Sequence, residues 1–567
     1  MKPGVTIPLV IAIAAAAWTA CNGGGGSKDG IADGDPLPDP AGEDADAETS
    51  DPVRDDLVSD DGPPPDDSPA PDGDLYEPVE YELTAAVARD NPYVEVTVTA
   101  EITPPAGSGE DPYTIPGFWD GGVTWRVRWA PRRPGAYEVR ITCSDTSDTG
   151  LHGRVFTYTA SDVFSAEWAP SGFVGIDPET TYYFVHDDGT KFLWVGDTNW
   201  INLYEHAWDQ PLFSDGSWGE LVARRAEYGF TVLQAVVYNT SESWDDGERP
   251  YAGGDTPDPD VVNPLSWQRV DARVQAAVRG GLMMYLMTSS DGHHFDWGEE
   301  QRERLYRYIV ARYAAYNVAF GGGEEVDRGG FGTDEKYRHM IDRLHALDPY
   351  RRMVGLHATG RGTILVPDDV DMLLIQYYTS DIAYETSYEN SRPYGKPYVC
   401  AETWYFDSGN PGMDDPVTIR RMAWRIYLGG AAGYTYGHMG IVVSSGSSHP
   451  GGYDMADLTD ESAAEMRTIS WWLQHTGLEW WALSRFENLG GGRYLSADPG
   501  RQYVIYTEDS ADAFTVDLSD ASGTLTGEWF DIASDASAGS VSVEAGASVS
   551  FEPPGPWHVL LLGLPEL

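Results

Sequence analysis

The stretch LMMYLMTSSDGHHFDWGEEQRERLYRYIVARYAAYNVAFGGGEE, residues 282 to 325, contains the unit from which the fold is predicted. It begins with a nearly continuous apolar run and ends with a second one. Between them lies a segment whose apolar residues recur every three or four positions. The two runs predict buried strands and the spacing between them predicts an amphipathic helix. Near-continuous apolar strands joined by a helix are typical of a parallel sheet that is covered on both faces.

The same alternation extends in both directions from this stretch. We predict eight strands, at FLWVGDTNW (192–200), TVLQAVVYN (231–239), LMMYLMTSS (282–290), NVAFGGGEE (317–325), RMVGLHA (352–358), MLLIQYY (372–378), PYVCAET (397–403) and GYTYGH (433–438). Amphipathic helices lie between most of them, although the connections after the fifth and sixth strands are short of helical pattern. Eight such units over about 270 residues predict a closed (β/α)8 barrel. An open doubly wound sheet is the alternative, but it would usually carry a glycine-rich phosphate loop after its first strand, and GDTNW is not one.

Both flanks of the barrel have a different pattern, with short alternating strands separated by Gly, Pro and Asp turns. This pattern predicts small β-domains. In the first flank the predicted strands are YVEVTVTAEI (93–102), VTWRVRWAP (123–131), GAYEVRITCS (135–144) and RVFTYTA (154–160). The predicted fold class is therefore α/β, with a TIM barrel at residues 172–485 between an N-terminal β-sandwich at 76–160 and a small C-terminal β-sandwich at 486–567.

The first 75 residues predict export rather than a folded domain. Residues 1–21 combine one Lys with an apolar run and small residues before Cys21, which resembles a bacterial lipoprotein signal with lipidation at Cys21. Residues 22–75 hold 17 Asp and Glu and no aromatic residue, so they predict a disordered acidic tether. We expect a membrane-anchored lipoprotein at the cell surface or in the periplasm. The alternative is plain secretion after cleavage nearby.

The composition narrows the choice of partner. A formal net charge of −53 argues against nucleic acid and against anionic membrane surfaces, because binding to phosphate depends on Lys and Arg. The 20 Trp and 33 Tyr exceed what packing usually requires, and surplus aromatic side chains often stack on sugars. The aromatic surplus therefore suits a carbohydrate substrate. No recognisable metal-ligand spacing occurs, so we expect no cofactor. The oligomeric state is not predicted.

In a parallel barrel the active site forms at the carboxyl ends of the strands, so polar residues there are the candidates. Those ends carry Asp197, Thr198, Trp200, Tyr238, Asn239, Ser289, Asp291, His294, Glu324, Glu325, Asp327, His357, Gln376, Tyr377, Tyr378, Glu402, Trp404, Tyr405, Tyr436 and His438. Two carboxyl groups across one mouth suit the cleavage of a glycosidic bond, since one protonates the leaving oxygen while the other stays ionised. The fourth and seventh strands lie across the mouth from each other, and they carry Glu325 and Glu402. A separation of about 5 to 5.5 Å between these carboxyl groups predicts retention of configuration, and about 6.5 to 9.5 Å predicts inversion.

Four motifs carry a resemblance to known families. NVAFGGGEEVD (317–327) resembles the fourth-strand motif of the retaining barrel glycosidases of clan A, and KPYVCAETWY (396–405) resembles their seventh-strand segment. FLWVGDTNW and GGAAGYTYGHMG (429–440) are similar to the first and eighth strands of the apiosidase-like family. The first flank resembles a sandwich domain that often precedes such barrels, and the last resembles the module that carries the name collagen-binding domain.

The resemblance implies roles for individual residues. Glu325 takes the position of the acid/base and Glu402 that of the nucleophile, while Glu324 falls where many clan members have a sugar-binding Asn. The family name implies plant pectic side chains as the substrate. From their places at the strand ends, the other candidates for substrate binding are Asp197, Trp200, Tyr238, Asn239, His294, His357, Tyr377, Trp404, Tyr436 and His438.

Several of these assignments have alternatives. Adjacent residues of an extended segment point to opposite sides, so either Glu324 or Glu325 addresses the cleaved bond, and we choose Glu325. The same alternation means that one of Tyr377 and Tyr378 faces the mouth and the other packs outward. Asp197 is a structural hydrogen-bonding residue or a sugar ligand, and His294 is a surface-loop residue or a substrate contact.

The sequence therefore predicts an exported, retaining glycoside hydrolase of the two-glutamate type. The alternative is a surface adhesin without catalytic activity, which uses the barrel as a scaffold for binding glycans or collagen. A barrel alone does not decide between them, because this fold hosts many activities.

Overall fold

The structure is a computed structural model of the chain. It describes residues 72–200, 203, 215–237, 249–253, 256–288, 293–323, 325–326, 334–359, 370–379, 381–407, 415–442 and 459–563, to which all structural statements refer. None of the helices in these ranges is both long and apolar enough to cross a membrane.

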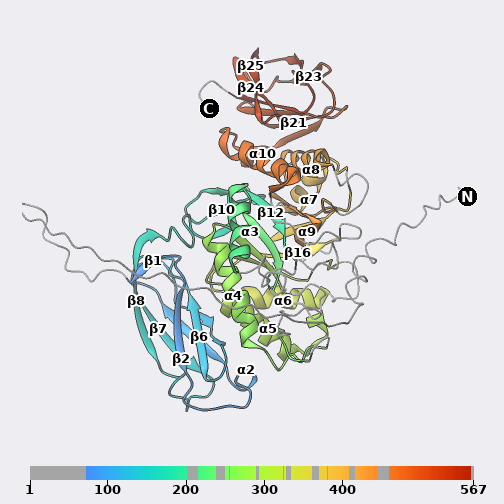
Figure 1. Cartoon of the computed structure of the whole chain (residues 1–567). Coiled ribbons are helices and arrows are strands. Elements are labelled where there is room, and N and C mark those ends of the chain that lie inside the picture. Colours follow the sequence, from blue (N-terminus) through green and yellow to red (C-terminus); the bar gives the residue numbers. More distant parts are fainter. Residues whose placement is uncertain are drawn as a thin grey trace, which may run out of the picture. The chain divides into compact units, whose positions relative to one another are not determined.

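Eight parallel strands close into a barrel and follow one another around it in sequence order. Each strand lies within one of the eight predicted segments, so the predicted (β/α)8 barrel is confirmed. The strands are β12 (Trp194–Thr198), β13 (Val232–Val236), β14 (Met283–Met287), β15 (Val318–Gly321), β16 (Val354–Ala358), β17 (Met372–Gln376), β18 (Tyr398–Glu402) and β19 (Gly433–Tyr436). Figure 1 labels two of them, β12 and β16, with helices α3 to α8 around them.

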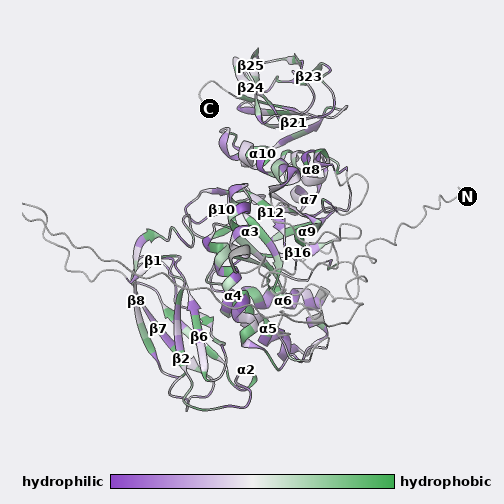
Figure 2. Ribbon diagram, in the orientation of Figure 1, coloured by the Kyte–Doolittle hydropathy of each residue, from purple (hydrophilic) through white to green (hydrophobic). Residues whose placement is uncertain are grey.

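Burial explains why these strands are apolar along their whole length. Every residue of the eight strands is buried, because side chains on one face fill the barrel and those on the other face contact the surrounding helices. Hydrophilic and hydrophobic residues are mixed in the helices of this region, as Figure 2 shows. The helices are α3 (Asp215–Glu227), α4 (Pro264–Arg279), α5 (Glu299–Tyr313), α6 (Asp334–Leu347), α7 (Thr386–Ser391), α8 (Pro416–Leu428), α9 (Met439–Val442) and α10 (Glu461–His475).

Local sequence signals set where several helices begin. The side chain of Asn263 caps α4, that of Asp415 caps α8 and that of Asp460 caps α10, each by accepting a hydrogen bond from a backbone N–H of the first turn. A proline follows the cap in α4 and α8, where its fixed φ and missing N–H suit the first helical position. The sixth connection is short of helix as predicted, with the six-residue α7 and the 3-10 turn Arg392–Tyr394.

Two antiparallel-rich sheets precede the barrel. One has the order β1 (Gly73–Leu75), β8 (Val155–Phe164), β7 (Gly135–Cys143), β3 (Val98–Thr103) and β4 (Tyr113–Pro116). The other has the order β2 (Val79–Thr84), β6 (Thr124–Trp129) and β5 (Phe118–Trp119). The predicted strand at 93–102 is partly wrong, because Pro92–Glu95 forms the helical turn α2 and the strand starts at Val98. Asn91 followed by Pro92 is a helix-start signal that overrides the alternation.

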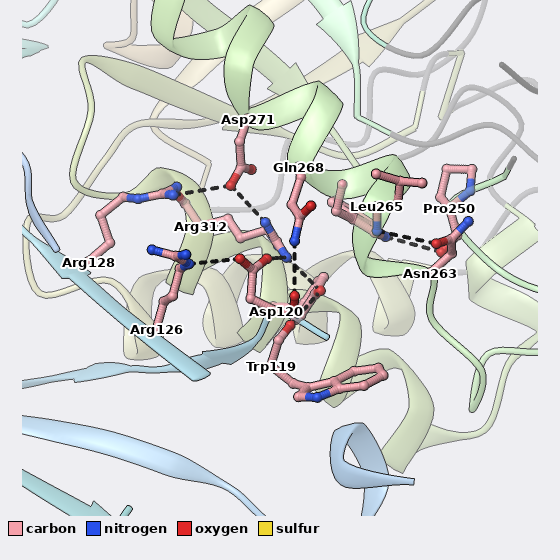
Figure 3. Close-up of polar contacts among 12 residues, drawn as sticks. Trp119, Asp120, Arg126, Arg128, Pro250, Asn263, Leu265, Gln268, Asp271 and Arg312 are labelled. Carbon is pink, nitrogen blue, oxygen red and sulfur yellow. Dashed lines mark hydrogen bonds and ion pairs between the residues drawn. The ribbon is translucent and has the colours of Figure 1, made fainter. Parts of the chain in front are cut away.

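A buried network of charges joins the three-stranded sheet of β2, β6 and β5 to helices α4 and α5 of the barrel (Figure 3). The guanidinium of Arg312 contacts Asp271 at 2.7 Å and Asp120 at 2.8 Å. Asp120 also pairs with Arg126 at 2.8 Å, and Asp271 with Arg128 at 3.1 Å. Because each buried charge has an opposite partner, the network avoids the cost of an unpaired ion and ties the N-terminal domain to the barrel.

A small three-stranded sheet of β9 (Val174–Ile176), β10 (Phe184–His186) and β11 (Lys191–Phe192) leads into the barrel. The chain ends in a six-stranded sheet and a two-stranded sheet with their own apolar core. The six-stranded sheet has the order β20 (Arg485–Asn488), β21 (Arg493–Asp498), β22 (Gln502–Thr507), β27 (His558–Gly563), β24 (Thr524–Asp531) and β25 (Ala536–Glu544). Strands β23 (Phe514–Asp517) and β26 (Ser548–Phe551) form the other sheet.

Candidate active site

Glu402 is the last residue of the seventh barrel strand, β18, and its carboxylate is almost fully buried. Two phenol groups donate hydrogen bonds to its Oε1 atom. The hydroxyl of Tyr378 lies at 2.7 Å, and the hydroxyl of Tyr405 makes a second, short contact. Both phenols therefore occupy the same carboxylate oxygen and fix the orientation of the Glu402 side chain.

Trp200, which follows the first barrel strand, fixes the second phenol. Its indole Nε1 donates a hydrogen bond to the hydroxyl oxygen of Tyr405 at 2.6 Å. Because the phenol oxygen accepts this bond, its own proton is directed to Glu402. The indole ring also meets the ring of His357 edge to face, with centroids 5.5 Å apart. Residues from the first, fifth and seventh strands are therefore in contact at one point.

His357 lies on β16 and is fully buried between the two predicted catalytic segments. Its Nδ1 accepts a hydrogen bond from the backbone N–H of Glu325 at 3.3 Å, so the proton of a neutral ring resides on Nε2. Nε2 lies 3.4 Å from Oε2 of Glu402. This separation suits an electrostatic contact, although Nε2 makes no direct hydrogen bond within the described residues. The ring thus links the backbone of one glutamate to the carboxylate of the other.

Glu325 lies beyond the end of the fourth strand and is half-buried. Its Oε1 accepts a hydrogen bond from Nε2 of Gln376 at 2.7 Å, and Gln376 ends the sixth strand. The φ angle of Glu325 is 51°, a left-handed conformation that costs a residue with a side chain about 1 kcal/mol or more. Strain of this kind concentrates at active sites, where surrounding contacts hold the residue in place.

Glu325 does not lie in an extended segment of the backbone. The choice between Glu324 and Glu325 assumed an extended segment, but β15 ends at Gly321 and Glu325 is left-handed. Alternation therefore does not apply there. The carboxylate of Glu325 reaches the mouth through a turn and through its bond to Gln376, and Glu324 lies outside the described residues.

The two tyrosines after the sixth strand separate as alternation requires. The hydroxyl of Tyr378 reaches Glu402, whereas the hydroxyl of Tyr377 accepts a hydrogen bond from Asn390 of α7 at 2.7 Å. Tyr377 was the predicted substrate contact, and the structure places its hydroxyl away from Glu402. Trp404 is half-buried beside Tyr378, with ring centroids 4.9 Å apart.

Asp197 is placed in a buried ion pair. It is fully buried, its Oδ2 lies 2.9 Å from Nε of Arg225 on α3, and Asn199 donates a hydrogen bond to the same oxygen. Burial raises the pKa of Asp197, while the guanidinium of Arg225 opposes that rise. These partners of Oδ2 are those of a structural residue, while Oδ1 is buried and has no hydrogen-bond partner within the described residues.

Three further candidates are buried in contacts of their own. The ring of Tyr436 is fully buried and its hydroxyl lies 2.5 Å from Ser462 Oγ. His438 pairs with Asp460 at 3.1 Å, at the start of α10. The side chain of His294 is fully buried, with Nε2 at 3.5 Å from Thr288 Oγ1, so it is not a surface-loop residue. None of these three contacts involves Glu325 or Glu402.

Two roles were not assigned from the sequence. Gln376 and Tyr405 were grouped with the strand ends, but nothing in the sequence indicates that Gln376 holds Glu325 or that Tyr405 holds Glu402. Thr198 is buried at the end of β12. The other predicted residues lie outside the described ranges; they are Cys21, Tyr238, Asn239, Ser289, Asp291, Glu324 and Asp327. Across the described ranges, no group of three or more His, Cys, Asp and Glu could hold a metal ion.

Comparisons with known proteins agree with this architecture. A family model described as apiosidase-like, catalytic domain, matches residues 178–481, and a model of a domain of unknown function, DUF5060, matches residues 74–144. Among solved structures, the chain is similar to a candidate glycoside hydrolase from Bacteroides vulgatus ATCC 8482, with 18% identity over 87% of this chain and 99% of that one and a TM-score of 0.68. It is also similar to a family 5 glycoside hydrolase from the same organism, with 15% identity over 69% of this chain and 94% of that one and a TM-score of 0.56. No curated protein matches the sequence. At these identities the solved structures support the fold.

Proposed function

The chain belongs to the apiosidase-like family of glycoside hydrolases, and on that premise we propose that it is a retaining enzyme with Glu402 as nucleophile and Glu325 as acid/base. The observation that carries the proposal is the environment of Glu402. Two phenol donors hold its carboxylate at the end of the seventh strand, and His357 links it to Glu325. A nucleophilic carboxylate must be held in a fixed position at the reacting carbon, and these contacts hold Glu402 in that way.

From the hydrogen bonds we assign an atom to each proposed step. Tyr378 and Tyr405 both occupy Oε1 of Glu402, so Oε2 attacks the anomeric carbon. Gln376 donates to Oε1 of Glu325, so the proton of the acid form lies on Oε2 of that residue. In the first step, the bond from Glu402 to the anomeric carbon forms while the glycosidic bond breaks, and Glu325 gives its proton to the leaving oxygen.

The second step returns the enzyme to its starting state. Glu325, now ionised, takes a proton from a water molecule whose oxygen attacks the anomeric carbon. The ester bond to Glu402 breaks, and the carboxylate returns to the hydrogen bonds of the two phenols. Two displacements at one carbon give net retention of configuration.

The substrate that we propose is a polysaccharide or oligosaccharide, with plant pectic side chains as the first choice. The family description supports this choice. Trp200, which bonds to Tyr405, and Trp404, which packs on Tyr378, supply aromatic rings on which a sugar can stack.

A screen of polysaccharides and aryl glycosides tests the proposal, with the anomeric configuration of the first product followed by proton NMR. The expected result is hydrolysis with retention, which is abolished by Glu402→Gln without loss of the fold. Inversion of configuration, or a Glu402→Gln variant as active as the wild type, would contradict the mechanism.

We also propose that the protein is exported and attached to a membrane through lipid on Cys21. The apolar segment and small residues before Cys21, followed by the acidic segment at 22–75, support this proposal. The Cys21→Ala variant should move from the membrane fraction to the soluble fraction in a bacterial host that processes lipoproteins. A wild-type chain found only in the soluble fraction would contradict it.

A further inference from the structure

A groove of about 1100 Å³ lies between helix α10 and the C-terminal six-stranded sheet. Its lining includes residues of α10 and of strands β22, β24, β25 and β27. None of its lining residues belongs to the set around Glu402 and Glu325. The groove is therefore separate from the candidate active site in its residues, and its chemistry can be considered independently.

The floor of the groove is the outer face of the sheet. Along β24, Leu525 and Trp529 are buried in the core of the C-terminal domain, so Thr526, Glu528 and Phe530 point to the opposite face. All three of these line the groove. A strand face that carries a hydroxyl, a carboxylate and a ring presents both polar and apolar contacts to a ligand.

The neighbouring strand continues this polar floor. Ser542 of β25 lies opposite Thr526, and Ser540 lies opposite Glu528. Both serines are exposed and line the groove. Directly opposed residues on paired strands have their side chains close together on one face. The floor thus carries a row of hydroxyl groups next to a carboxylate.

One wall of the groove is aromatic. Consecutive tryptophans on α10 have opposite environments, because Trp472 is buried against Trp424 of α8 while Trp471 is 48% exposed. Trp471 is the only tryptophan among the exposed large hydrophobic residues in the described part of the chain. Because Trp471 also lines the groove, its ring is open to contact by a ligand there.

The ring of Trp471 is held in a fixed orientation. The imidazole of His475, one helical turn later, stacks on it with centroids 5.4 Å apart and planes 10° apart. Nδ1 of His475 also lies 2.9 Å from the carbonyl oxygen of Trp471, so its N–H donates to that oxygen and fixes the imidazole. A pre-ordered aromatic platform loses little conformational entropy when a ligand binds.

From these observations we propose that the groove is a second carbohydrate-binding site, which takes a segment of a neutral polysaccharide chain. A sugar ring presents an apolar face that can stack on Trp471 and hydroxyl groups that can bond to Ser540, Ser542, Thr526 and Glu528. The charged side chains of the groove disfavour a polyanion. Its lining holds two carboxylates, Glu528 and Asp535, and one guanidinium, Arg467, which lies 3.6 Å from Asp535.

The site extends the proposed function. A polysaccharide bound in the groove raises the local concentration of the same polymer at the barrel mouth. The rate of polymer hydrolysis therefore increases, while hydrolysis of small glycosides does not change. The inference that a polysaccharide binds here does not itself require Glu402 to be a nucleophile.

Affinity gel electrophoresis of the full chain tests the site. The gels contain galactomannan, xyloglucan or arabinan as neutral probes and polygalacturonate as the anionic probe, and the chain carries Glu402→Gln so that the polymers stay intact. We expect at least one neutral probe to retard the chain. Trp471→Ala should weaken that binding about tenfold, the change typical when an aromatic anchor is truncated. Tyr394→Ala is the matched control, since Tyr394 is an aromatic residue 43% exposed outside the groove, and it should bind like the parent.

Several results would overturn the proposal. They are equal binding by the Trp471→Ala variant and its parent, retardation by polygalacturonate alone, and the absence of retardation by any neutral probe. Binding to immobilised collagen that depends on Trp471, without binding to the neutral probes, would show a protein ligand instead. If Trp471→Ala does not fold, Glu528→Ala on the exposed face of β24 takes its place, with weaker binding expected and unchanged binding contradicting the site.

The outcome separates this site from the catalytic proposal. With Glu402 intact, Trp471→Ala should leave kcat/KM on a small aryl glycoside unchanged and lower it on the polymer that binds. If Trp471→Ala binds the polymer as well as its parent while hydrolysis still depends on Glu402, only the proposed binding site is refuted. Trp471-dependent binding in a protein whose hydrolysis does not depend on Glu402 would refute the mechanism alone.

Discussion

The Nε2 atom of His357 lies 3.4 Å from Oε2 of Glu402, while the other ring nitrogen accepts a hydrogen bond from the backbone N–H of Glu325. One buried imidazole therefore contacts both segments that carry the proposed chemistry. Because its position depends on the fifth strand, the fold of the barrel fixes the relation between the fourth and seventh strands at the mouth.

Replacing His357 should impair catalysis more than substrate binding. His357→Gln cannot contact both partners, so Glu402 loses a polar neighbour and the turn at Glu325 loses an acceptor. We expect kcat to fall about 10² -fold, a loss typical of removing a group that supports a reacting centre, with little change in KM. Steady-state kinetics measure both constants. His438→Gln is the control, because His438 pairs with Asp460 and should affect kcat much less. Wild-type kcat in His357→Gln would contradict this role.

The two phenols on Glu402 give a second prediction. Tyr405→Phe and Tyr378→Phe each remove one donor to Oε1, and each should lower kcat about 10-fold to 10² -fold. Tyr377→Phe is a matched control on the same segment, since the hydroxyl of Tyr377 bonds to Asn390 rather than to the carboxylate. Equal decreases of kcat in Tyr377→Phe and Tyr378→Phe, measured with the same aryl glycoside, would show that the hydrogen bond to Glu402 does not support catalysis.

Chemical rescue distinguishes the two adjacent glutamates. In Glu325→Ala the glycosyl ester should form from a substrate with a good leaving group and then persist, because no base activates water. Azide needs no base, so it should restore turnover and give a glycosyl azide of retained configuration. Product analysis by chromatography and NMR identifies it. Rescue of Glu324→Ala, with none for Glu325→Ala, would reverse the assignment.

The barrel was predictable because each of its strands is buried on both faces. Burial of this kind leaves a continuous apolar run such as LMMYLM, which stands out against the helical spacing around it. The start of β3 was less predictable, since the local signal of Asn91 and Pro92 competes with an alternating pattern that reaches back to Tyr93.

The location of the site residues at the strand ends was predictable, but the contacts of their side chains were less so. Position at a strand end identified Glu402, Trp200 and His357, which the structure brings together. The same rule also selected Asp197 and Tyr436, whose partners lie on helices α3 and α10. Strand ends show which residues are close to the mouth, but the distant partner that fixes each side chain is not encoded in the local sequence.

The pH dependence of stability has a testable contribution from Asp460. Burial opposes ionisation of this carboxyl, but hydrogen bonds from His438, the Ala463 N–H and Ser462 outweigh it and lower its pKa below 3.8. A lowered pKa in the folded state stabilises the protein above the unfolded pKa, and this contribution disappears as the pH falls through the folded value.

Asp460→Asn isolates this charge, because Asn still caps α10. The wild type should have the higher midpoint of thermal unfolding near neutral pH, and the difference should shrink as the pH is lowered below about 3.8. Calorimetry at several pH values checks it. A difference that stays constant down to acidic pH would show that the charge of Asp460 does not contribute.

The charge network predicts that the N-terminal domain and the barrel are energetically coupled. Asp271→Ala leaves Arg312 and Arg128 with one fewer buried partner and should lower the free energy of unfolding by about 3 kcal/mol. Urea unfolding followed by fluorescence measures the loss. Glu82→Ala is the control, because Glu82 pairs with Arg126 while more than half exposed and should change stability by less than about 1 kcal/mol. Similar values for the two variants would contradict the coupling.

The most direct test of the central claim is to trap the covalent intermediate. A substrate analogue with fluorine at carbon 2 and a good leaving group forms the glycosyl ester rapidly and hydrolyses it slowly. Mass spectrometry of the peptides should then find one added glycosyl group on Glu402, absent from Glu402→Gln. A glycosyl group on another residue, or fast turnover of the natural substrate without any trapped ester, would contradict the account.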